Sequence, residues 1–294
     1  MQIFLDEHCF VSYFENVTEG LSSLQAMIDL MEVIIDATHL ELFVPENIFS
    51  FDINGVTIGE LIYANYADST VRDILRQFEY IVNAAELIPE NIEHGPSAVA
   101  GLRNAKRGGV VTNWDCEAQS WWCADRMHKI TNVIDLRSSI RTFFVTERLS
   151  EAEFCEYSKS MFDSLYFHCP ADNIKNLGLK FVNFVSEIVK HLAYLNDRAL
   201  IDFEECANDR EVSTRAGSHG VNMSPESHAT RNDRKAMQQR EVTVLKVPIV
   251  CEWHTKLTRT QGRIHFYPWT GKHDKLAKLI GKKVIIGIIC EHLD

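Results

Sequence analysis

Several features that would identify a protein class are missing from this sequence. No apolar run approaches the roughly 18 residues that span a bilayer, and the first residues carry no basic segment. We therefore expect no membrane helix, no cleaved signal peptide and a cytoplasmic location. Neither a Walker A motif nor a G-x-G-x-x-G segment occurs, which argues against phosphate-loop and dinucleotide enzymes. With 46% apolar residues among 294, the chain can bury one large core or two ordinary ones.

Paired cysteines are also missing, because none of the eight cysteines forms a C-x-x-C pair. Without an export signal we expect reduced thiols that pack as small apolar groups. The spacing of Cys116, Cys123 and His128 leaves a structural zinc site open, with His168 or Cys169 as a fourth ligand. The alternative is simple core packing beside three tryptophans, Trp114, Trp121 and Trp122.

Basic residues are scarce at the start of the chain and frequent at its end. Residues 1–100 contain 17 acids and two bases, whereas residues 211–294 contain 8 acids and 14 bases. The formal net charge of −11 therefore hides a gradient. Two interpretations remain open: the basic segment contacts phosphates, or it docks against the acidic N-terminal region. If the basic segment contacts phosphates, the acidic region is a candidate surface for a protein partner.

The apolar periodicity predicts an α+β protein, helix-rich at first and ending in a small antiparallel sheet. We divide it into an acidic mixed α/β region, residues 1–138, and an α+β domain, residues 139–294. Apolar residues almost vanish at about 206–241, which predicts a polar insertion.

Three local predictions concern the second region. We expect a strand at Arg141–Val145, followed by a helix that Ser150 caps with acids in its first turn. Within the insertion, Ser224 is placed to cap a helix that has Pro225 at its first position.

The most informative stretch begins at Val242, where the hydrophobic period changes to two. Two strands, at 250–257 and 263–267, are joined by a Gly-containing turn, and an apolar strand follows at 284–290. Because side chains alternate between faces, pairing the two strands as a hairpin gathers polar side chains on one face. These candidate site residues are Glu252, His254, Lys256, Arg263, His265 and Tyr267, with His292 just past the final strand.

This set suits RNA cleavage without a metal ion or cofactor. Such a reaction needs a base for the 2′-hydroxyl, cations for the phosphate and an acid for the leaving oxygen. Histidine serves either proton role near neutral pH, and Lys256 and Arg263 can neutralise phosphate. Tyr267 and Trp269 are candidates to stack on a splayed base. The alternative is an ordinary solvated sheet face.

The segment from Trp253 to Tyr267, with the 283–292 strand after it, resembles the C-terminal sheet of the RelE/ParE/HigB toxin superfamily. The resemblance covers about 40 of the 294 residues. It implies an mRNA interferase, with Lys256 and Arg263 at catalytic positions. The sequence ends at Asp294 without that family's basic, Tyr-bearing tail, so His254, His265 and His292 are expected to serve instead.

Three functional hypotheses follow. The first is a metal-independent endoribonuclease of toxin or antiviral phage-defence type, a hydrolase that binds RNA and contains no cofactor. The second is a non-enzymatic subunit that binds nucleic acid or a partner protein within a larger assembly. The third is a metal-dependent nuclease in the N-terminal half, where a strand ending in Asp6, with Glu41, Asp52 and Glu60, resembles a PIN-type metal site.

Overall fold

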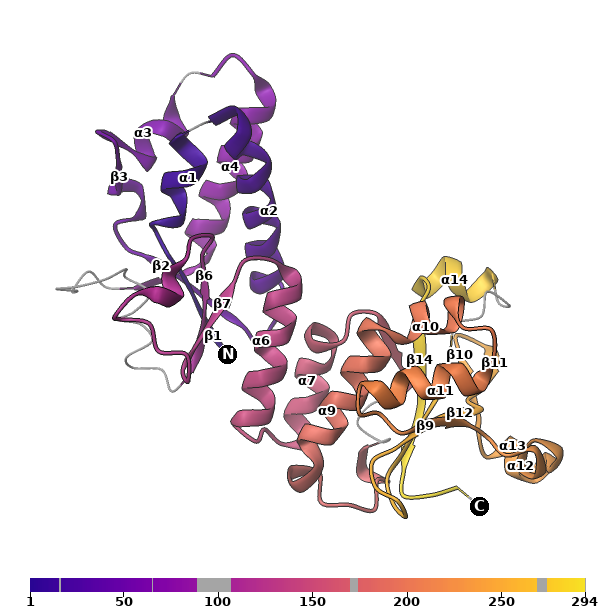
Figure 1. Cartoon of the computed structure of the whole chain (residues 1–294). Coiled ribbons are helices and arrows are strands. Elements are labelled where there is room, and N and C mark those ends of the chain that lie inside the picture. The colour runs from indigo at the N-terminus through magenta and orange to yellow at the C-terminus, as the bar shows by residue number, and fades with distance from the viewer. Residues whose placement is uncertain (16, 65, 89–106, 170–173, 269–273, 294) are drawn as a thin grey trace. The chain divides into compact units, whose positions relative to one another are not determined.

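The computed structural model describes most of the chain as two compact units, Met1–Phe143 and Phe144–Asp294 (Figure 1). The residues described are 1–15, 17–64, 66–88, 107–169, 174–268 and 274–293. The protein is α+β, as predicted. The predicted division at residue 138 falls inside helix α6 (Val133–Thr146), which contains the division between the units. None of the described helices is long and apolar enough to cross a membrane.

The first unit is built on a parallel five-stranded sheet in the order β5-β2-β1-β6-β7. The first strand of the chain is central, and its residues Ile3 and Leu5 are completely buried. Such apolar strands suit a sheet covered on both faces. The strands are β1 (Gln2–Leu5), β2 (Glu41–Pro45), β5 (Glu86–Ile88), β6 (Gly108–Val111) and β7 (Met127–Ile130).

Helices and a short ribbon complete the first unit. Helix α2 packs against both α1 and α4, and the three lie side by side in Figure 1. Helix α3 starts with a capping box in which Thr57 and Glu60 satisfy each other's backbone N–H groups. The elements are α1 (Cys9–Glu15), α2 (Val17–Ile35), α3 (Ile58–Tyr63), α4 (Ser69–Ala84), the ribbon β3 (Asp52–Ile53) and β4 (Val56–Thr57), and 3-10 turns at Ile48–Ser50 and Cys116–Ala118.

The second unit contains the five-stranded sheet that the sequence predicts at its end. Its order is β8-β14-β13-β12-β9, antiparallel except for the parallel pair β8–β14. A register shift between His265 and Phe266 marks a bulge in the β13–β14 pair. The strands are β8 (Leu165–Phe167), β9 (Met223–Pro225), β12 (Trp253–Lys256), β13 (Arg263–Tyr267) and β14 (Val284–Cys290).

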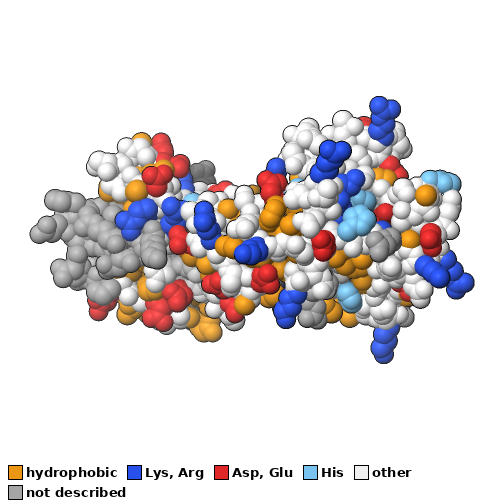
Figure 2. Space-filling model, turned by 90° about the horizontal axis from the view of Figure 1, so that it is seen from below, with side chains coloured by type: hydrophobic (Ala, Val, Ile, Leu, Met, Phe, Trp, Pro, Cys, Tyr) orange, Lys and Arg blue, Asp and Glu red, His pale blue; other side chains and the backbone are white. Residues whose placement is uncertain are grey.

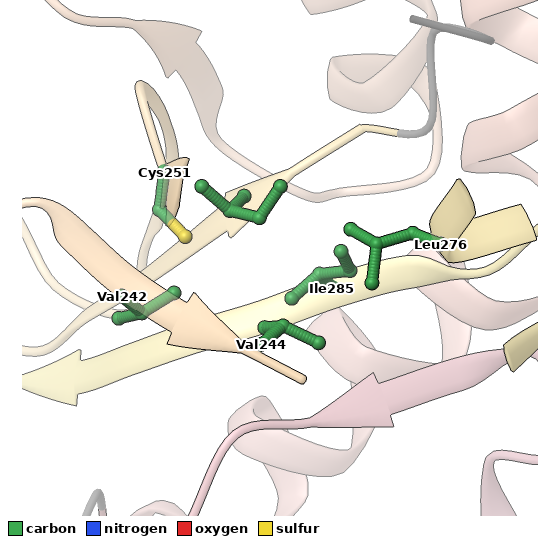
Figure 3. Close-up of a cluster of buried hydrophobic side chains, with 6 residues drawn as sticks. Val242, Val244, Cys251, Leu276 and Ile285 are labelled. Carbon is green, nitrogen blue, oxygen red and sulfur yellow. The ribbon is translucent and has the colours of Figure 1, made fainter. Parts of the chain in front are cut away.

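This sheet is covered on both faces. On one, Phe203 of α10 packs against Trp253 and Phe266, with ring centroids 4.8 and 6.3 Å apart. On the other, the hairpin β10 (Glu241–Val244) and β11 (Val247–Val250) forms an apolar cluster with α14 (Asp274–Ile280) and β14 (Figure 3). The remaining helices are α7 (Glu151–Met161), α9 (Phe181–Asp197), α10 (Ala199–Glu205), α11 (Asp209–Ser218), α12 (His228–Asn232) and α13 (Arg234–Gln238).

Two local predictions are wrong and one is confirmed. Residues Arg141–Val145 lie in helix α6 rather than in a strand, and the strand of this region is β8. Ser224 lies in strand β9, while Ser227 caps helix α12 through the N–H of Thr230. Ser150 does cap α7, in a capping box with Glu153.

Candidate functional site

The β12–β13 hairpin places four of the predicted side chains opposite one another. His254 pairs with His265, and Lys256 pairs with Arg263, in the antiparallel register. The centroids of the two imidazole rings are 5.2 Å apart. Two imidazoles and two cations therefore occupy one short stretch of adjacent strands.

A carboxylate that the sequence analysis missed joins this group. Glu226 directly follows β9, and its backbone N–H donates to the carbonyl of Glu252 at 2.8 Å. Its Oε1 lies 3.2 Å from Nδ1 of His254 and 3.5 Å from Nδ1 of His265. Nε of Arg240, another missed residue, donates to the same oxygen at 2.8 Å. We call these four side chains, Glu226, Arg240, His254 and His265, the buried polar cluster.

Burial controls the chemistry of this cluster. Burial first, and then the neighbouring charge of His254, lower the pKa of His265 to about 3, so that imidazole is neutral at pH 7. For Glu226, burial alone would raise the pKa, but interactions with His254 and Arg240 outweigh it and lower the pKa to about 2. Both ring nitrogens of His265 and Nδ1 of His254 are buried, and the two Nδ1 atoms face Oε1 of Glu226 at ion-pair distance rather than in hydrogen-bond geometry. Of the two imidazoles only His254 is partly accessible, with 11% of its side chain exposed.

Arg263 is held as a structural residue. It is 6% exposed, and its guanidinium donates to the carbonyls of Thr258, Arg259 and Gly262 at 3.1 to 3.2 Å. These bonds fix the turn between β12 and β13. A guanidinium whose donors are committed to backbone carbonyls has little left to offer a phosphate.

The remaining predicted residues do not share the buried polar cluster. The side chain of Glu252 is 43% exposed and lies 3.6 Å from Nε of Arg231. Tyr267 packs against the apolar cluster of β10 and β11, and His292 is exposed beyond β14. The sequence predicts that the six candidate residues of the hairpin gather on one face, with a solvated face as the alternative. The structure brings His254 and His265 into the buried polar cluster, whereas Tyr267 packs with β10, β11 and α14. Trp269 lies outside the described residues.

Lys256 is the accessible cation of the hairpin. It is partly exposed and lines a cavity of about 370 Å³ together with His191 and Glu187 of α9 and Arg259 of the turn. Lys256 also follows His254 by two residues, so their Cα atoms are about 7 Å apart along the strand. An imidazole and an ammonium group are thus neighbours along β12.

Glu226, His254 and His265 also meet one requirement of a metal site, because their ligand atoms lie within 4.8 Å of one another. Two imidazoles and one carboxylate form a known ligand set for transition metals. However, Nε of the Arg240 guanidinium already pairs with Oε1 of Glu226 at 2.8 Å. This fixed positive charge opposes a cation at the same oxygen, so the arrangement suits a proton-transfer network better than a metal centre.

A second polar cluster lies at the switch point of the parallel sheet in the first unit. Connections leave β1 toward β2 on one side and return to β6 on the other, which is where doubly wound sheets bind ligands. Asp6, fully buried just after β1, accepts from Thr112 Oγ1 at 2.9 Å and from Trp114 Nε1 at 2.6 Å. It also accepts from the backbone N–H of His8 and raises the pKa of that imidazole through a side-chain hydrogen bond.

The PIN-like hypothesis needs further carboxylates beside Asp6, and the structure places the predicted ones in other roles. Glu41 begins β2 in register with Gln2, at the opposite end of the parallel strands from Asp6. Asp52 accepts the N–H of Gly55 in a turn, and Glu60 closes the capping box of α3. Among the described residues of the first unit, the ligand atoms that converge within 4.8 Å are those of Asp6, Glu7 and His8, and Trp114 and Thr112 already donate to Oδ2 of Asp6.

The predicted zinc ligands do not assemble among the described residues. Cys116, Cys123 and His128 are not within ligand distance of one another as a group. Cys123 packs against an apolar cluster with Trp121 and Trp122, and burial raises the pKa of Cys116 to about 11. None of the eight cysteines is joined in a disulfide.

Comparisons of the chain with protein-family models, with curated proteins and with solved structures find no match. The RelE-like and PIN-like resemblances therefore stay predictions from the sequence. The function has to be argued from the geometry of the sites.

Proposed function

We propose that the protein is a metal-independent endoribonuclease whose site lies at the β12–β13 hairpin, as an effector of toxin or defence type acting in the cytoplasm. The observation that carries the proposal is the cross-strand register. It sets His254 against His265 and Lys256 against Arg263, beside the carboxylate of Glu226. The RelE-like pattern of the same segment supports the proposal.

We assign the reacting roles to His254 and Lys256, because 11% of the His254 side chain is exposed and Lys256 is partly exposed. His254 removes the proton of a 2′-hydroxyl, and the resulting oxyanion attacks the adjacent phosphorus. The ammonium of Lys256 neutralises the charge that builds on the phosphate and protonates the departing 5′-oxygen. The products are a 2′,3′-cyclic phosphate and a 5′-hydroxyl.

The buried members act as positioning residues. Glu226 lies 3.2 Å from Nδ1 of His254 and orients the ring, while Arg240 holds Glu226 in place. His265, which burial keeps neutral at pH 7, adds no positive charge beside His254. Arg263 fixes the turn after Lys256.

Cleavage of labelled RNA by the purified full chain tests the proposal. We expect cleavage in the presence of EDTA, products with 2′,3′-cyclic phosphate ends and no cleavage of DNA of the same sequence. His254→Gln and Lys256→Gln should each lower the rate at least about a hundredfold, the usual contribution of a general acid or base. His228→Gln and Lys246→Gln are matched controls, because both residues are exposed and lie outside the site.

Two outcomes would replace this proposal. Salt-sensitive RNA binding without turnover would support the non-enzymatic subunit, with the acidic residues 1–100 as the surface for a basic protein partner. Cleavage that requires Mg²⁺ and disappears in Asp6→Asn would support the PIN-like nuclease. Expression of the wild type and of Lys256→Gln in a bacterial host tests the effector role, since only the wild type should inhibit growth.

A further inference from the structure

Two hollows adjoin on the surface of the second unit. The cavity beside Lys256, of about 370 Å³, is lined by residues of α9, of the turn after β12 and of the loop between α11 and β9. A second cavity of about 450 Å³ is lined by α11 and the same loop. Gly220 and Asn222 line both, so the two hollows form one groove along the α11–β9 loop.

The groove has unbalanced positive charge. Arg210, Lys256 and Arg259 line it, and none of them has an acidic partner within the described residues. The one carboxylate in the lining, Glu187, is already 3.5 Å from Nζ of Lys190. Three unpaired cations in a recess attract an anion that carries several charges.

The three cations of the groove come from separate places: Arg210 lies in the first turn of α11, Lys256 ends β12, and Arg259 lies in the turn after it. Over the whole face shown in Figure 2, Lys and Arg side chains are likewise scattered rather than fused into one patch. Such spacing suits a flexible strand that places individual phosphates on individual cations. His191 also lines the cavity beside Lys256, but it is 2% exposed and its Nε2 lies 3.8 Å from Oε2 of Glu187, so the cations carry the recognition of the strand.

Gly217 of α11 lines the second hollow and carries no side chain. A Cβ added to Gly217 would meet nothing within 4 Å, whereas one added to Gly220 would come within 2.9 Å of Nζ of Lys190. Gly217 has an ordinary helical position in α11. A larger side chain at residue 217 therefore projects into the groove without disturbing the packing.

We infer that this groove binds the backbone of single-stranded RNA, with phosphates on Arg210 and Arg259 and the strand leading to Lys256. The inference rests on the proposed function for the identity of the polymer, and it adds the path that the substrate follows. On this path the strand approaches along the α11–β9 loop and presents one phosphodiester to Lys256 at the end of β12, two residues from His254.

Binding of a fluorescent 2′-O-methyl oligoribonucleotide by the full chain tests the groove separately from cleavage, because this RNA lacks the attacking hydroxyl. Three phosphate contacts predict a slope of about −2 for log affinity against log salt concentration. Arg210→Gln and Arg259→Gln should each reduce that slope by about 0.7 and weaken binding several-fold at low salt. Arg234→Gln removes an exposed charge from α13, outside the groove, and should leave the slope unchanged.

A matched pair at Gly217 adds a steric and electrostatic test. Gly217→Glu places a carboxylate in the groove and should weaken binding more than Gly217→Gln, which has the same size without the charge. The inference would be overturned if Arg210→Gln, Arg259→Gln and Gly217→Glu each bound the RNA with the affinity and the salt dependence of the wild type. If the 2′-O-methyl RNA binds as expected but unmodified RNA is not cleaved, the groove stands and the endoribonuclease proposal fails.

Discussion

The neutral, buried state of His265 makes a quantitative prediction about stability. In the unfolded chain this imidazole titrates near pH 6.5, whereas in the folded protein its pKa is about 3. Between these values the unfolded state binds a proton that the folded state excludes, so stability falls as the pH is lowered from 6.5 toward 3. At pH 5 the loss from His265 alone is about 2 kcal/mol relative to pH 7.5.

Hydrogen exchange read by mass spectrometry on peptides from β12 and β13 measures this loss within the second unit. After correction for intrinsic exchange, the opening free energy of the wild type should drop between pH 7.5 and pH 5. In His265→Gln the drop should be smaller by about 2 kcal/mol. His191, whose pKa burial lowers to about 4, contributes to both proteins and cancels in the difference.

The control for this experiment is His292→Gln, because that imidazole is exposed beyond β14. It should show the same pH dependence as the wild type. If His265→Gln and the wild type lose equal free energy between the two pH values, the folded protein binds a proton at residue 265 as readily as the unfolded chain, and the argument from burial is refuted.

Two further substitutions test the polar clusters. Glu226→Gln removes a charge partner of Arg240, which is 3% exposed, and should lower the opening free energy of the second unit by about 3 kcal/mol in the same exchange measurement. Adding Arg240→Met should recover part of this loss. An unchanged opening free energy in Glu226→Gln would contradict the stabilising role of the ion pair. Trp114→Phe removes the indole N–H that donates to buried Asp6 at 2.6 Å, and it should lower the free energy of unfolding of the first unit by about 1 to 3 kcal/mol. Trp122→Phe is the control and should lower it less, because the indole of Trp122 makes no hydrogen bond among the described residues.

The hairpin at the centre of the proposed site could be predicted from the sequence because its information is local. Alternation of apolar and polar residues fixes which side chains share a face, and the turn ending in Gly262 fixes which residues pair. Gly262 has φ of +75°, a conformation that glycine adopts readily. That His254 and His265 share a face could be predicted from the alternation, and the structure adds that they pair directly across the two strands.

What covers this hairpin could not be predicted, because it depends on contacts between distant segments. Val242 and Val244 of β10 and Leu276 of α14 pack over β14 and bury the neighbouring polar face (Figure 3). The carboxylate of Glu226 could not be predicted for the same reason. Glu226 lies in a polar stretch without periodicity, and only the pairing of β9 with β12 brings it beside His254.

The wrong strand at Arg141–Val145 has a different cause. Five residues of mixed β-branched and aromatic character satisfy a strand pattern by themselves, yet they lie in the last turns of a helix that begins at Val133. The helix is favoured by its start, where the side chain of Asn132 accepts the N–H groups of Ile134 and Asp135. A longer window starting at residue 132 would have shown the helical period.

The order of strands in the two sheets has a consequence for synthesis on the ribosome. In the first unit β1 pairs with β2 about 40 residues later and with β6 more than 100 residues later, so a nascent chain presents an unpaired edge of its central strand for much of translation. In the second unit β14 pairs with both β8 and β13 and follows every other strand of its sheet. A growing chain therefore cannot complete the sheet around His265 until residues 284–290 have emerged, so the proposed catalytic centre assembles only after every other strand of its sheet has been synthesised.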